Sequence, residues 1–372
     1  MKSNYRALSE LIEKVDERND DGAITELIGV SIDKCFIKSV ANTNGTDLSK
    51  YKIIRKNEFA VSLMQVSRDS KIPVARLEDY EVAIMSPAYP IFRVKDTRKI
   101  LPEYLDMWLK RPEFDREAAF IAVGGVRGSM PWEEFVKMKL PVPTIEKQLE
   151  IVNSYKAITE RIALKQKIND NLLDSVQAIF RSWFVDYDPF DGVCPSNWET
   201  GCVEDIAEFF DSMRKPLSSL ERTDMERIYP YYGAVSIVDY VDDYIFDGEY
   251  LLVSEDGIYV VDENGHPLIQ HISGKFWANN HAHILKGKSG FNEDSLYLFL
   301  ANTNMAPIVT GAAQPKINQA NLKSFPITIP DSETMLKFNN IIQPFFDQRL
   351  TNESEIKKLE ALQSLLLTRL VD

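Results

Sequence analysis

The sequence predicts an α+β protein in which two mixed, β-rich globular domains are joined by two long helices that form an antiparallel coiled coil. Three observations lead to this prediction: an internal repeat, two long apolar stripes with a 3.5-residue period, and short β-type runs before each stripe. The repeat is plainest where "GGVRGSMPWEEFVKMKLPVP" (124–143) returns as "GAAQPKINQANLKSFPITIP" (311–330), with glycine over glycine and proline over proline. A repeat of this kind indicates that one structural unit occurs twice.

The repeat divides the chain into four segments. The two copies are offset by 187 residues, and this register holds without a gap over about sixty residues. A period of 187 residues is far too long for a solenoid. The aligned pairs include Phe135 and Leu322, Leu140 and Ile327, Pro143 and Pro330, Glu146 and Glu333, and Leu172 and Leu359. We therefore expect a globular domain at 1–143, a helix at 144–185, a second globular domain at 186–330 and a second helix at 331–372.

The first long helix is predicted to begin after Pro143. Thr144 can cap it, and Glu146 lies in the first turn, where the helix dipole favours a negative charge. Apolar residues then alternate at steps of four and three, which is the period of a coiled-coil seam. The predicted seam comprises Ile151, Tyr155, Ile158, Ile162, Leu172, Val176, Ile179 and Trp183, with the polar Lys165 and Asn169 at its middle.

The second helix repeats this pattern. Its predicted seam comprises Phe338, Ile342, Phe345, Ile356, Leu359, Leu366 and Leu370, with Arg349, Asn352 and Gln363 as polar members. Pro344 should distort the helix early. A helix of about 38 residues is roughly 57 Å long and cannot bury such a stripe on itself, so we expect the two stripes to pair. Polar seam positions cost stability and fix register or orientation. Separate packing of each helix on its own domain is the alternative.

The globular blocks have the pattern of short strands. Residues 244–286 contain β-branched and aromatic runs that are broken by the turn-forming dipeptides "DG" and "NG". Residues 71–94 show similar runs in the first block.

Composition restricts the function more than it defines it. The net charge of −13 argues against indiscriminate nucleic-acid binding, which needs clustered Lys and Arg. The excess acid lies in one block, because residues 186–330 carry 9 Lys+Arg against 22 Asp+Glu, whereas residues 1–140 carry 23 against 22. Three cysteines without a CxxC motif, no apolar run long enough to span a membrane and no signal-peptide pattern lead us to expect a cytoplasmic protein.

No catalytic constellation is recognisable in the sequence. There is no GxxxxGK[ST], GxGxxG, Asn/Asp-Pro-Pro-aromatic or GxSxG motif. His281 and His283 would share one face of a strand, but no third ligand is evident, so we expect no metal site. The carboxylate pairs Asp242/Asp243 and Glu255/Asp256 lie in turn-like sequence and are predicted to be solvated loop residues. The sequence therefore favours a chain that is not an enzyme.

Two variable blocks followed by matching helices resemble the specificity (S) subunits of type I restriction–modification systems. The resemblance covers essentially the whole chain, and its most specific part is "LPVPTIEKQLEIVNSYKAITERIALKQKINDNLLDSVQAIFRSWF" with its L-P-x-P-x-x-E-x-Q pattern. In the second block, "IYPYYGAVSIVDYVDDYIFDGEYLLVSEDG" and "GKFWANNHAHIL" are similar to the family's second half. The second copy, "FPITIPDSETMLKF", departs from the pattern because it lacks the Gln.

The resemblance implies a non-catalytic scaffold that binds double-stranded DNA. Each globular block would be a target recognition domain for one part of a bipartite site, and the paired helices would fix the spacer between the parts. Two modification (methyltransferase) subunits would dock on the chain and bring S-adenosylmethionine, and restriction (motor/nuclease) subunits would bring ATP and Mg. This chain itself would hold no cofactor, and no membrane would be involved.

Candidate DNA-binding residues follow from the chemistry of base edges. Arg, Lys, Asn and Gln side chains can form the hydrogen-bond pairs that distinguish bases in the major groove. The candidates are Lys34, Lys38, Gln65, Arg68, Lys71, Arg127 and Ser129 in the first block, and Tyr231, Tyr232, Lys275, Asn279, Asn280, Gln314, Lys316 and Asn318 in the second. For the asparagines, turn formation is the competing explanation.

Two other functions fit the same sequence features. One is a coiled-coil scaffold or adaptor that has no relation to DNA. The other is a fragment of a fused restriction–methyltransferase, which the missing methyltransferase motif disfavours.

Overall fold

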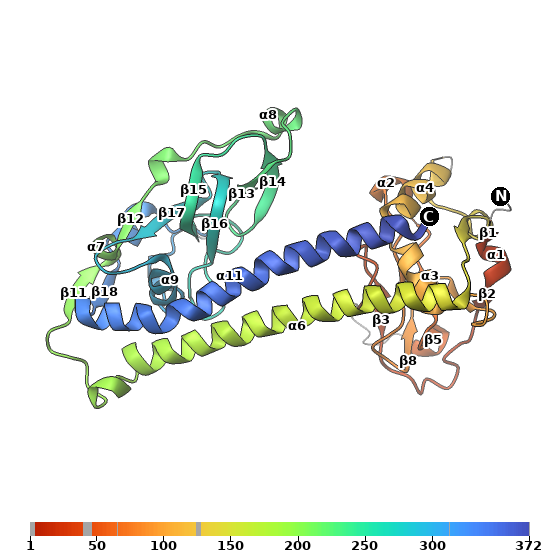
Figure 1. The fold of residues 1–372 in the computed structure, drawn as a ribbon, viewed down its shortest axis with the longest axis horizontal. Coiled ribbons are helices and arrows are strands. Elements are labelled where there is room, and N and C mark those ends of the chain that lie inside the picture. Colours follow the sequence, from red (N-terminus) through yellow and green to blue (C-terminus); the bar gives the residue numbers. More distant parts are fainter. Residues whose placement is uncertain (1–3, 40–46, 65, 124–127, 312, 372) are drawn as a thin grey trace. The chain divides into compact units, whose positions relative to one another are not determined.

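The computed structural model describes residues 4–39, 47–64, 66–123, 128–311 and 313–371. The chain forms two compact units: Met1–Lys165 with Glu355–Asp372, and Gln166–Ser354 (Figure 1). Both divisions fall inside long helices, so each unit contains a part of both helices. The predicted domain ranges 1–143, 144–185, 186–330 and 331–372 separate globular from helical segments instead, and they stay a prediction.

The first unit is built on a small antiparallel sheet with the strand order β2-β9-β6-β7. Its other strands form the pairs β1-β10, β3-β4 and β5-β8. The strands are β1 (Tyr5–Ala7), β2 (Ile12–Val15), β3 (Ile28–Val30), β4 (Phe36–Lys38), β5 (Lys52–Arg55), β6 (Phe59–Val61), β7 (Val74–Arg76), β8 (Val82–Met85), β9 (Ile91–Val94) and β10 (Lys139–Pro141). The helices are α1 (Leu8–Leu11), α2 (Val66–Asp69), α3 (Pro102–Leu109), α4 (Pro112–Ala122) and α5 (Trp132–Phe135).

The core of the first unit contains residues that lie far from the first globular block in the sequence. Phe59 and Phe92, on neighbouring strands, stack with ring centroids 5.1 Å apart. Leu370, near the end of the chain, is buried in the same cluster. Tyr155, from the first long helix, packs against it. The first globular block therefore completes its core with segments that lie far away in the sequence.

The second unit contains a six-stranded sheet with the order β12-β17-β15-β16-β13-β14 and the separate pair β11-β18. The strands are β11 (Glu199–Cys202), β12 (Ala207–Phe209), β13 (Tyr229–Tyr232), β14 (Ile237–Val241), β15 (Phe246–Ser254), β16 (Ile269–Ala278), β17 (Ala282–Gly287) and β18 (Pro326–Ile329). The helices are α7 (Val203–Ile206), α8 (Ser219–Thr223), α9 (Glu293–Ala301) and α10 (Gln319–Lys323). All pairs are antiparallel except β13 with β16.

Both faces of the six-stranded sheet are covered. Successive side chains of a strand point to opposite faces. On β15, Leu251 and Val253 belong to one buried cluster with residues of α9 and the long helices, whereas Leu252 packs in a second cluster with Phe276. This is why residues 250–254 have no polar alternation in the sequence.

The duplication predicted from the sequence is visible in the architecture. The chain order β1-α1-β2 in the first unit matches β11-α7-β12 in the second, and α5-β10 matches α10-β18. In each unit the first strand pairs antiparallel with the strand before the long helix. The two units therefore share a frame, while the segments inserted in that frame differ.

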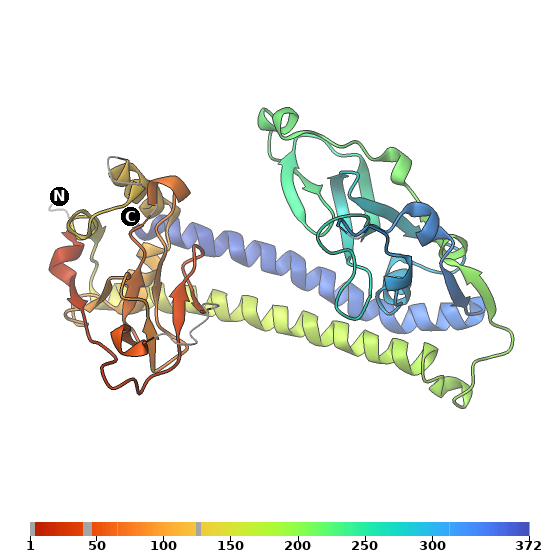
Figure 2. The same cartoon turned by 180° about the vertical axis from the view of Figure 1, so that it is seen from behind.

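The long helices are α6 (Ile145–Phe184) and α11 (Ser332–Thr368). In the first unit Gln363 donates to Thr159 (2.8 Å), and in the second Phe338 packs on Phe180. Figures 1 and 2 show residues 166–184 of α6 beside residues 332–354 of α11 in both views. Because the sequence numbers of the contacts rise on one helix as they fall on the other, the pairing is antiparallel. The predicted fold class is confirmed.

All the positions predicted for the two seams are buried or half-buried, including the polar ones. Leu370 lies just beyond α11, in the 3-10 turn Arg369–Val371. Pro344 lies inside α11, and the helix continues past it. The loss of one backbone hydrogen bond therefore does not end this helix, because tertiary packing on both sides of the proline holds it.

Polar residues meet at the middle of the seam. Asn352 (1% exposed) donates to the side-chain oxygen of Asn169 (2.7 Å), and Gln348 donates to Asn352 (3.0 Å). One turn away, Lys165 lies 2.7 Å from Glu355. These groups are satisfied in one register only, because a shift along the helix would place them against apolar neighbours.

Gln148 anchors α6 to the first domain. This side chain is fully buried, accepts from the Leu101 amide (2.9 Å) and donates to the carbonyls of Lys99 and Pro143 (2.9 Å each). It thus satisfies three backbone groups at once. In the second copy the aligned residue is Met335, which is also fully buried, and Asp331 caps the helix through Thr334 instead (3.0 Å). The second copy lacks the Gln of the L-P-x-P-x-x-E-x-Q pattern, and the Asp331 cap fixes the start of its helix instead.

We predict that Asn352→Ala destabilises the second unit by roughly 1–3 kcal/mol, because Asn169 is left buried without its partner. Replacing both residues by Leu should restore or raise stability, since no polar group is then left unpaired. Urea unfolding followed by circular dichroism measures both effects. Ser354→Ala, at an exposed position two residues away, is the control. Equal midpoints for Asn352→Ala and the control would refute a stabilising role of the pair.

Candidate nucleic-acid interface

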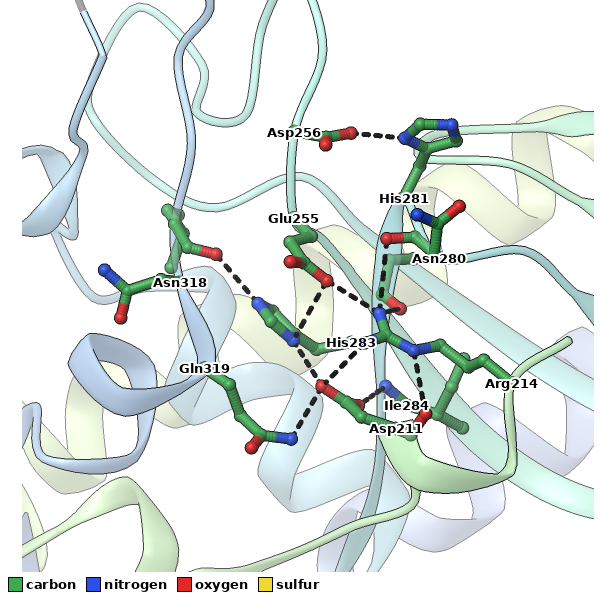
Figure 3. Close-up of polar contacts among 12 residues, drawn as sticks. Asp211, Arg214, Glu255, Asp256, Asn280, His281, His283, Ile284, Asn318 and Gln319 are labelled. Carbon is green, nitrogen blue, oxygen red and sulfur yellow. Dashed lines mark hydrogen bonds and ion pairs between the residues drawn. The ribbon is translucent and has the colours of Figure 1, made fainter. Parts of the chain in front are cut away.

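A buried charged network lies at one edge of the second unit (Figure 3). Asp211 begins the 3-10 turn Asp211–Met213 after β12, and Arg214 follows that turn. Glu255 follows β15, and His283 lies on β17. The strand order β12-β17-β15 places these three chain segments next to one another.

His283 is at the centre of the network and is fully buried. Its Nε2 lies 2.8 Å from the Ile317 carbonyl, and its Nδ1 lies 2.6 Å from Oδ2 of Asp211. A carbonyl oxygen only accepts, so Nε2 donates to Ile317. The two ring nitrogens therefore connect the Ile317 backbone to the Asp211 carboxyl group.

The carboxylates of the network are ionised. Burial raises the pKa of the Asp211 carboxyl, but the hydrogen bond and charge of His283 and the charge of Arg214 bring it below its ordinary value. Burial likewise opposes ionisation of Glu255, and hydrogen bonds from Arg214 (2.7 Å) and Lys316 lower the pKa of that carboxyl. Asp211 and Glu255 thus both contact Arg214 and His283, and Glu255 also contacts Lys316.

The network fixes the end of the loop between residues 309 and 319. The Ile317 amide donates to the Glu255 carbonyl (2.9 Å), and Lys316 Nζ lies 3.0 Å from Glu255 Oε1. Gln319 donates to Asp211 Oδ2 (2.7 Å). Asp256 and Thr310 each form an antiparallel bridge with Lys316. This amide-rich loop, singled out in the sequence, is therefore anchored at residues 316–319.

The turn between β16 and β17 meets the same edge. The Glu255 amide donates to the His281 carbonyl (2.9 Å), and Nδ1 of His281 lies 2.5 Å from Asp256. Arg214 donates to the Ala282 carbonyl (2.6 Å). Three segments, residues 255–256, 279–282 and 316–319, therefore form one surface, which we call the three-segment edge. Figure 3 shows Asp256 joined to His281, and Glu255 and Asp211 joined to His283.

The network has the donor set of a metal site but is already neutralised. Ligand atoms of Asp211, Glu255 and His283 lie within 4.8 Å of one another. Each carboxylate already contacts a cationic side chain, and Arg214 cannot lose its proton. A dication would have to displace these cations, so the geometry fits an ion-pair network better.

The sequence did not indicate this network. The predicted face shared by the two histidines separates into an exposed His281 and a buried His283. The interpretation of Glu255 and Asp256 as solvated loop acids is wrong, because their side chains are only 12% and 16% exposed. Asp211, Arg214 and Gln319 were missed, since they approach His283 only in the folded sheet.

The candidates of the second block have different environments. Asn280, Gln314 and Lys275 are exposed, and Lys316 and Asn318 are half-buried. Lys275 Nζ lies over the Tyr244 ring at 4.3 Å. Tyr231 is 2% exposed and its hydroxyl accepts from the Leu217 amide (2.9 Å), while half-buried Tyr232 packs on Phe276.

Two of the candidate asparagines bond to the local backbone, which was the alternative to a role in DNA binding. Asn279 is 9% exposed and accepts from the His281 amide (2.9 Å). Asn318 caps α10 by accepting from the Asn321 amide (2.8 Å). Of the candidate set, the structure thus brings Asn279, Asn280, Lys316 and Asn318 together at the three-segment edge.

In the first block, Lys34 is an internal cation. It is 6% exposed, lies 2.7 Å from Asp115 and donates to the Leu109 carbonyl (2.5 Å). Burial lowers the pKa of the Lys34 ammonium, and the Asp115 hydrogen bond partly offsets this effect. The Lys34–Asp115 pair fixes the turn between β3 and β4 on α4. The Lys34 ammonium is therefore not exposed to a ligand.

The other described candidates of the first block lie near the surface. Arg68 (63% exposed side chain) pairs with Asp69 at 2.7 Å, and Lys71 lies 3.8 Å from Asp33. The Met130 amide donates to the Leu63 carbonyl (2.9 Å), which brings half-buried Ser129 close to α2. Lys38 is exposed on β4, 3.9 Å from Glu26. Gln65 and Arg127 lie outside the described residues.

Among the described residues, no helix is both long enough and apolar enough to cross a bilayer.

Comparisons with known proteins agree with this architecture. Residues 195–362 match the family model "Type I restriction modification DNA specificity domain". A segment of 128 residues is 39% identical to the putative type I restriction enzyme specificity subunit S.HindORF215P of Haemophilus influenzae, covering 34% of this chain and 32% of that protein. This chain thus spans about a third of that relative's length. The type I restriction enzyme MjaIX specificity subunit of Methanocaldococcus jannaschii is 21% identical over 297 residues, 73% of this chain and 68% of that protein.

A solved structure has the same fold along the whole chain. The crystal structure of the type I restriction–modification S subunit from M. genitalium superposes with a TM-score of 0.58 at 15% identity, covering 100% of this chain and 97% of the other. Residues 195–362 thus match a type I restriction modification DNA specificity domain, and the chain as a whole shares the fold of a solved S subunit.

Proposed function

We propose that this chain is the sequence-specific DNA-binding subunit of a type I restriction–modification complex and that it recognises a bipartite duplex target. The observation that carries the proposal is the duplicated frame with unlike loops: α5-β10 and α10-β18 correspond, while "GGVRGSMPW" in one copy stands against "GAAQPKINQ" in the other. Two similar domains with different loops suit two different half-sites.

In this proposal the two domains differ in how they contact DNA. The three-segment edge offers the exposed Asn280 and the half-buried Lys316 and Asn318 from a fixed backbone, and Asn and Lys side chains can distinguish bases in the major groove. The first domain offers Arg68, Lys71 and Ser129 beside α2. The chain itself is non-catalytic: it positions DNA for other subunits, and it acts in the cytoplasm.

The paired helices would set the spacing between the half-sites. Half-sites one helical turn apart lie about 34 Å from each other, so a helical spacer of similar scale selects which pairs of half-sites are bound together. The buried Asn169–Asn352 pair supports this role because it specifies one register. Lengthening both helices by whole heptads should lengthen the spacer.

Partner subunits would supply the chemistry and much of the DNA affinity. Residues 186–330 carry a net charge of −13 (9 Lys+Arg, 22 Asp+Glu), which opposes phosphate binding. We propose that two modification subunits dock on this chain and provide basic surfaces and S-adenosylmethionine, and that restriction subunits provide ATP- and Mg-dependent cleavage.

Selection from a random duplex pool tests the proposed function. The full chain, co-expressed with a type I modification subunit, should retain duplexes with two conserved blocks at a constant separation. A variant with one added heptad in each helix should retain the same blocks at a larger separation. Stable assembly with the partner but no duplex enrichment would instead support the adaptor alternative.

We predict that Lys316→Ala weakens binding to the selected duplex about three- to tenfold and lowers the salt slope of log K by about one, because one phosphate or base contact is lost. Fluorescence anisotropy at several salt concentrations measures both. Lys337→Ala is the control, since Lys337 forms an exposed ion pair with Glu333 on α11 (2.7 Å). The same affinity and slope in Lys316→Ala as in wild type would remove Lys316 from the interface.

We predict that His283→Leu abolishes selection for the half-site of the second domain and keeps selection for the other. The substitution removes a fully buried partner of Asp211 and Glu255, a loss of about 3–5 kcal/mol for a buried pair, and it removes the donor to Ile317. Hydrogen exchange at the Ile317 amide should become at least about tenfold faster. His266→Leu, at a partly exposed histidine that pairs with Asp262, serves as the control. An unchanged Ile317 exchange rate would contradict the anchoring role.

A further inference from the structure

The loop between β15 and β16 carries an exposed apolar pair. Ile258 is 82% exposed and Tyr259 is 72% exposed, whereas the next residue, Val260, is 1% exposed. We call Ile258 and Tyr259 the apolar tip. Single exposed apolar residues are common, but an adjacent isoleucine and tyrosine that are both largely in water carry a hydration cost that a ligand would relieve.

The backbone on both sides of the apolar tip is fixed. Before it, the backbone of Glu255 bonds to Ile317 and His281 (2.9 Å each), and Asp256 bridges to Lys316. After it, the Leu268 amide donates to the Val260 carbonyl (3.0 Å), and Val260 is part of the domain core. Only three residues separate these two anchors, so little conformational entropy remains to be lost when the tip contacts a ligand.

The apolar tip continues directly from the three-segment edge. Asp256, two residues before Ile258, contacts both His281 and Lys316. Exposed Asn280 precedes His281, and exposed Gln314 precedes Lys316 by two residues. Apolar side chains and side chains suited to base edges therefore lie on the same part of the domain.

We propose that the apolar tip is a wedge that enters the DNA duplex and unstacks one base step at the half-site of the second domain. This inference rests on the proposed DNA-binding function and adds a way of deforming the target. Proteins that kink DNA insert one or two apolar side chains between neighbouring bases. A two-residue tip matches that size, whereas a stable protein interface needs an apolar patch several times larger. The cost of unstacking makes binding sensitive to how flexible the base step is, so the wedge adds sequence preference without a hydrogen bond to a base.

The test uses the complex of the full chain with its modification subunit and the duplex that the wild-type complex selects. 2-Aminopurine is placed in turn at each position of the second half-site and its flanks, and its fluorescence rises when the base unstacks. Wild-type protein should raise the fluorescence at one step. The double variant Ile258→Ala with Tyr259→Ala should abolish the rise and weaken binding about tenfold, the loss expected for one stacking contact. Tyr259→Phe should keep the signal, because the ring is retained.

The control is Ile237→Ala with Val238→Ala, a second adjacent pair of exposed apolar residues (41% and 55%) on edge strand β14 of the same sheet. It should leave the fluorescence and the affinity unchanged. Tight binding by wild type with no fluorescence rise at any step overturns the wedge and leaves the DNA function standing. If the tip variant binds DNA normally but releases the modification subunit, the tip is a protein contact and the wedge is overturned. A wild-type complex that selects no duplex rejects the proposed function itself.

Discussion

The structure depends on the burial of two helical stripes that neither helix can cover alone. Each seam spans nearly five heptads, and at about 25 cal/mol per Å² of apolar surface its exposure to water would cost far more than a domain's net stability. The antiparallel pairing buries both stripes within each unit, and it also brings residues of the helical segments into the two domain cores. Leu370 completes the core of the first unit, and Val176 contributes to that of the second. Neither core is contiguous in sequence.

A frame that is fixed in this way leaves the loops free to differ. The elements that pack against the helices recur in both copies, and they even tolerate a change from Gln148 to Met335 at the start of the helix, because different groups satisfy the backbone there. The second domain adds a buried ion network that fixes residues 316–319, whereas the first uses the Lys34–Asp115 pair to fix the tip near α4. The two domains thus share a frame, but different ion pairs fix their loops.

The ion network also illustrates how charge is used in an acidic domain. The carboxylates of Asp211 and Glu255 pair with His283, Arg214 and Lys316 inside the domain. They therefore do not contribute free negative charge at the three-segment edge. Removing Arg214 or His283 would take a partner from both carboxylates at once, and losing a partner is costly for a buried charge. The local charge at this edge therefore differs from the charge of the whole block, and the global value of −13 says little about it.

The sequence alone determined the duplication, the two long helices and the helical seam, because these follow from local periodicity and from an offset that can be seen by alignment. It also indicated the loop at 311–318 as unusual. Tertiary structure decided what that loop rests on: His283 meets Asp211, 72 residues away, through the sheet order β12-β17-β15, which no local pattern encodes. It also separated side chains of the same type, since Lys34 is buried while Lys316 is partly exposed, and Asn279 and Asn318 form turns. Residue type fixes what a side chain can bond to, but only the folded environment decides whether backbone, a buried ion or a ligand takes that bond.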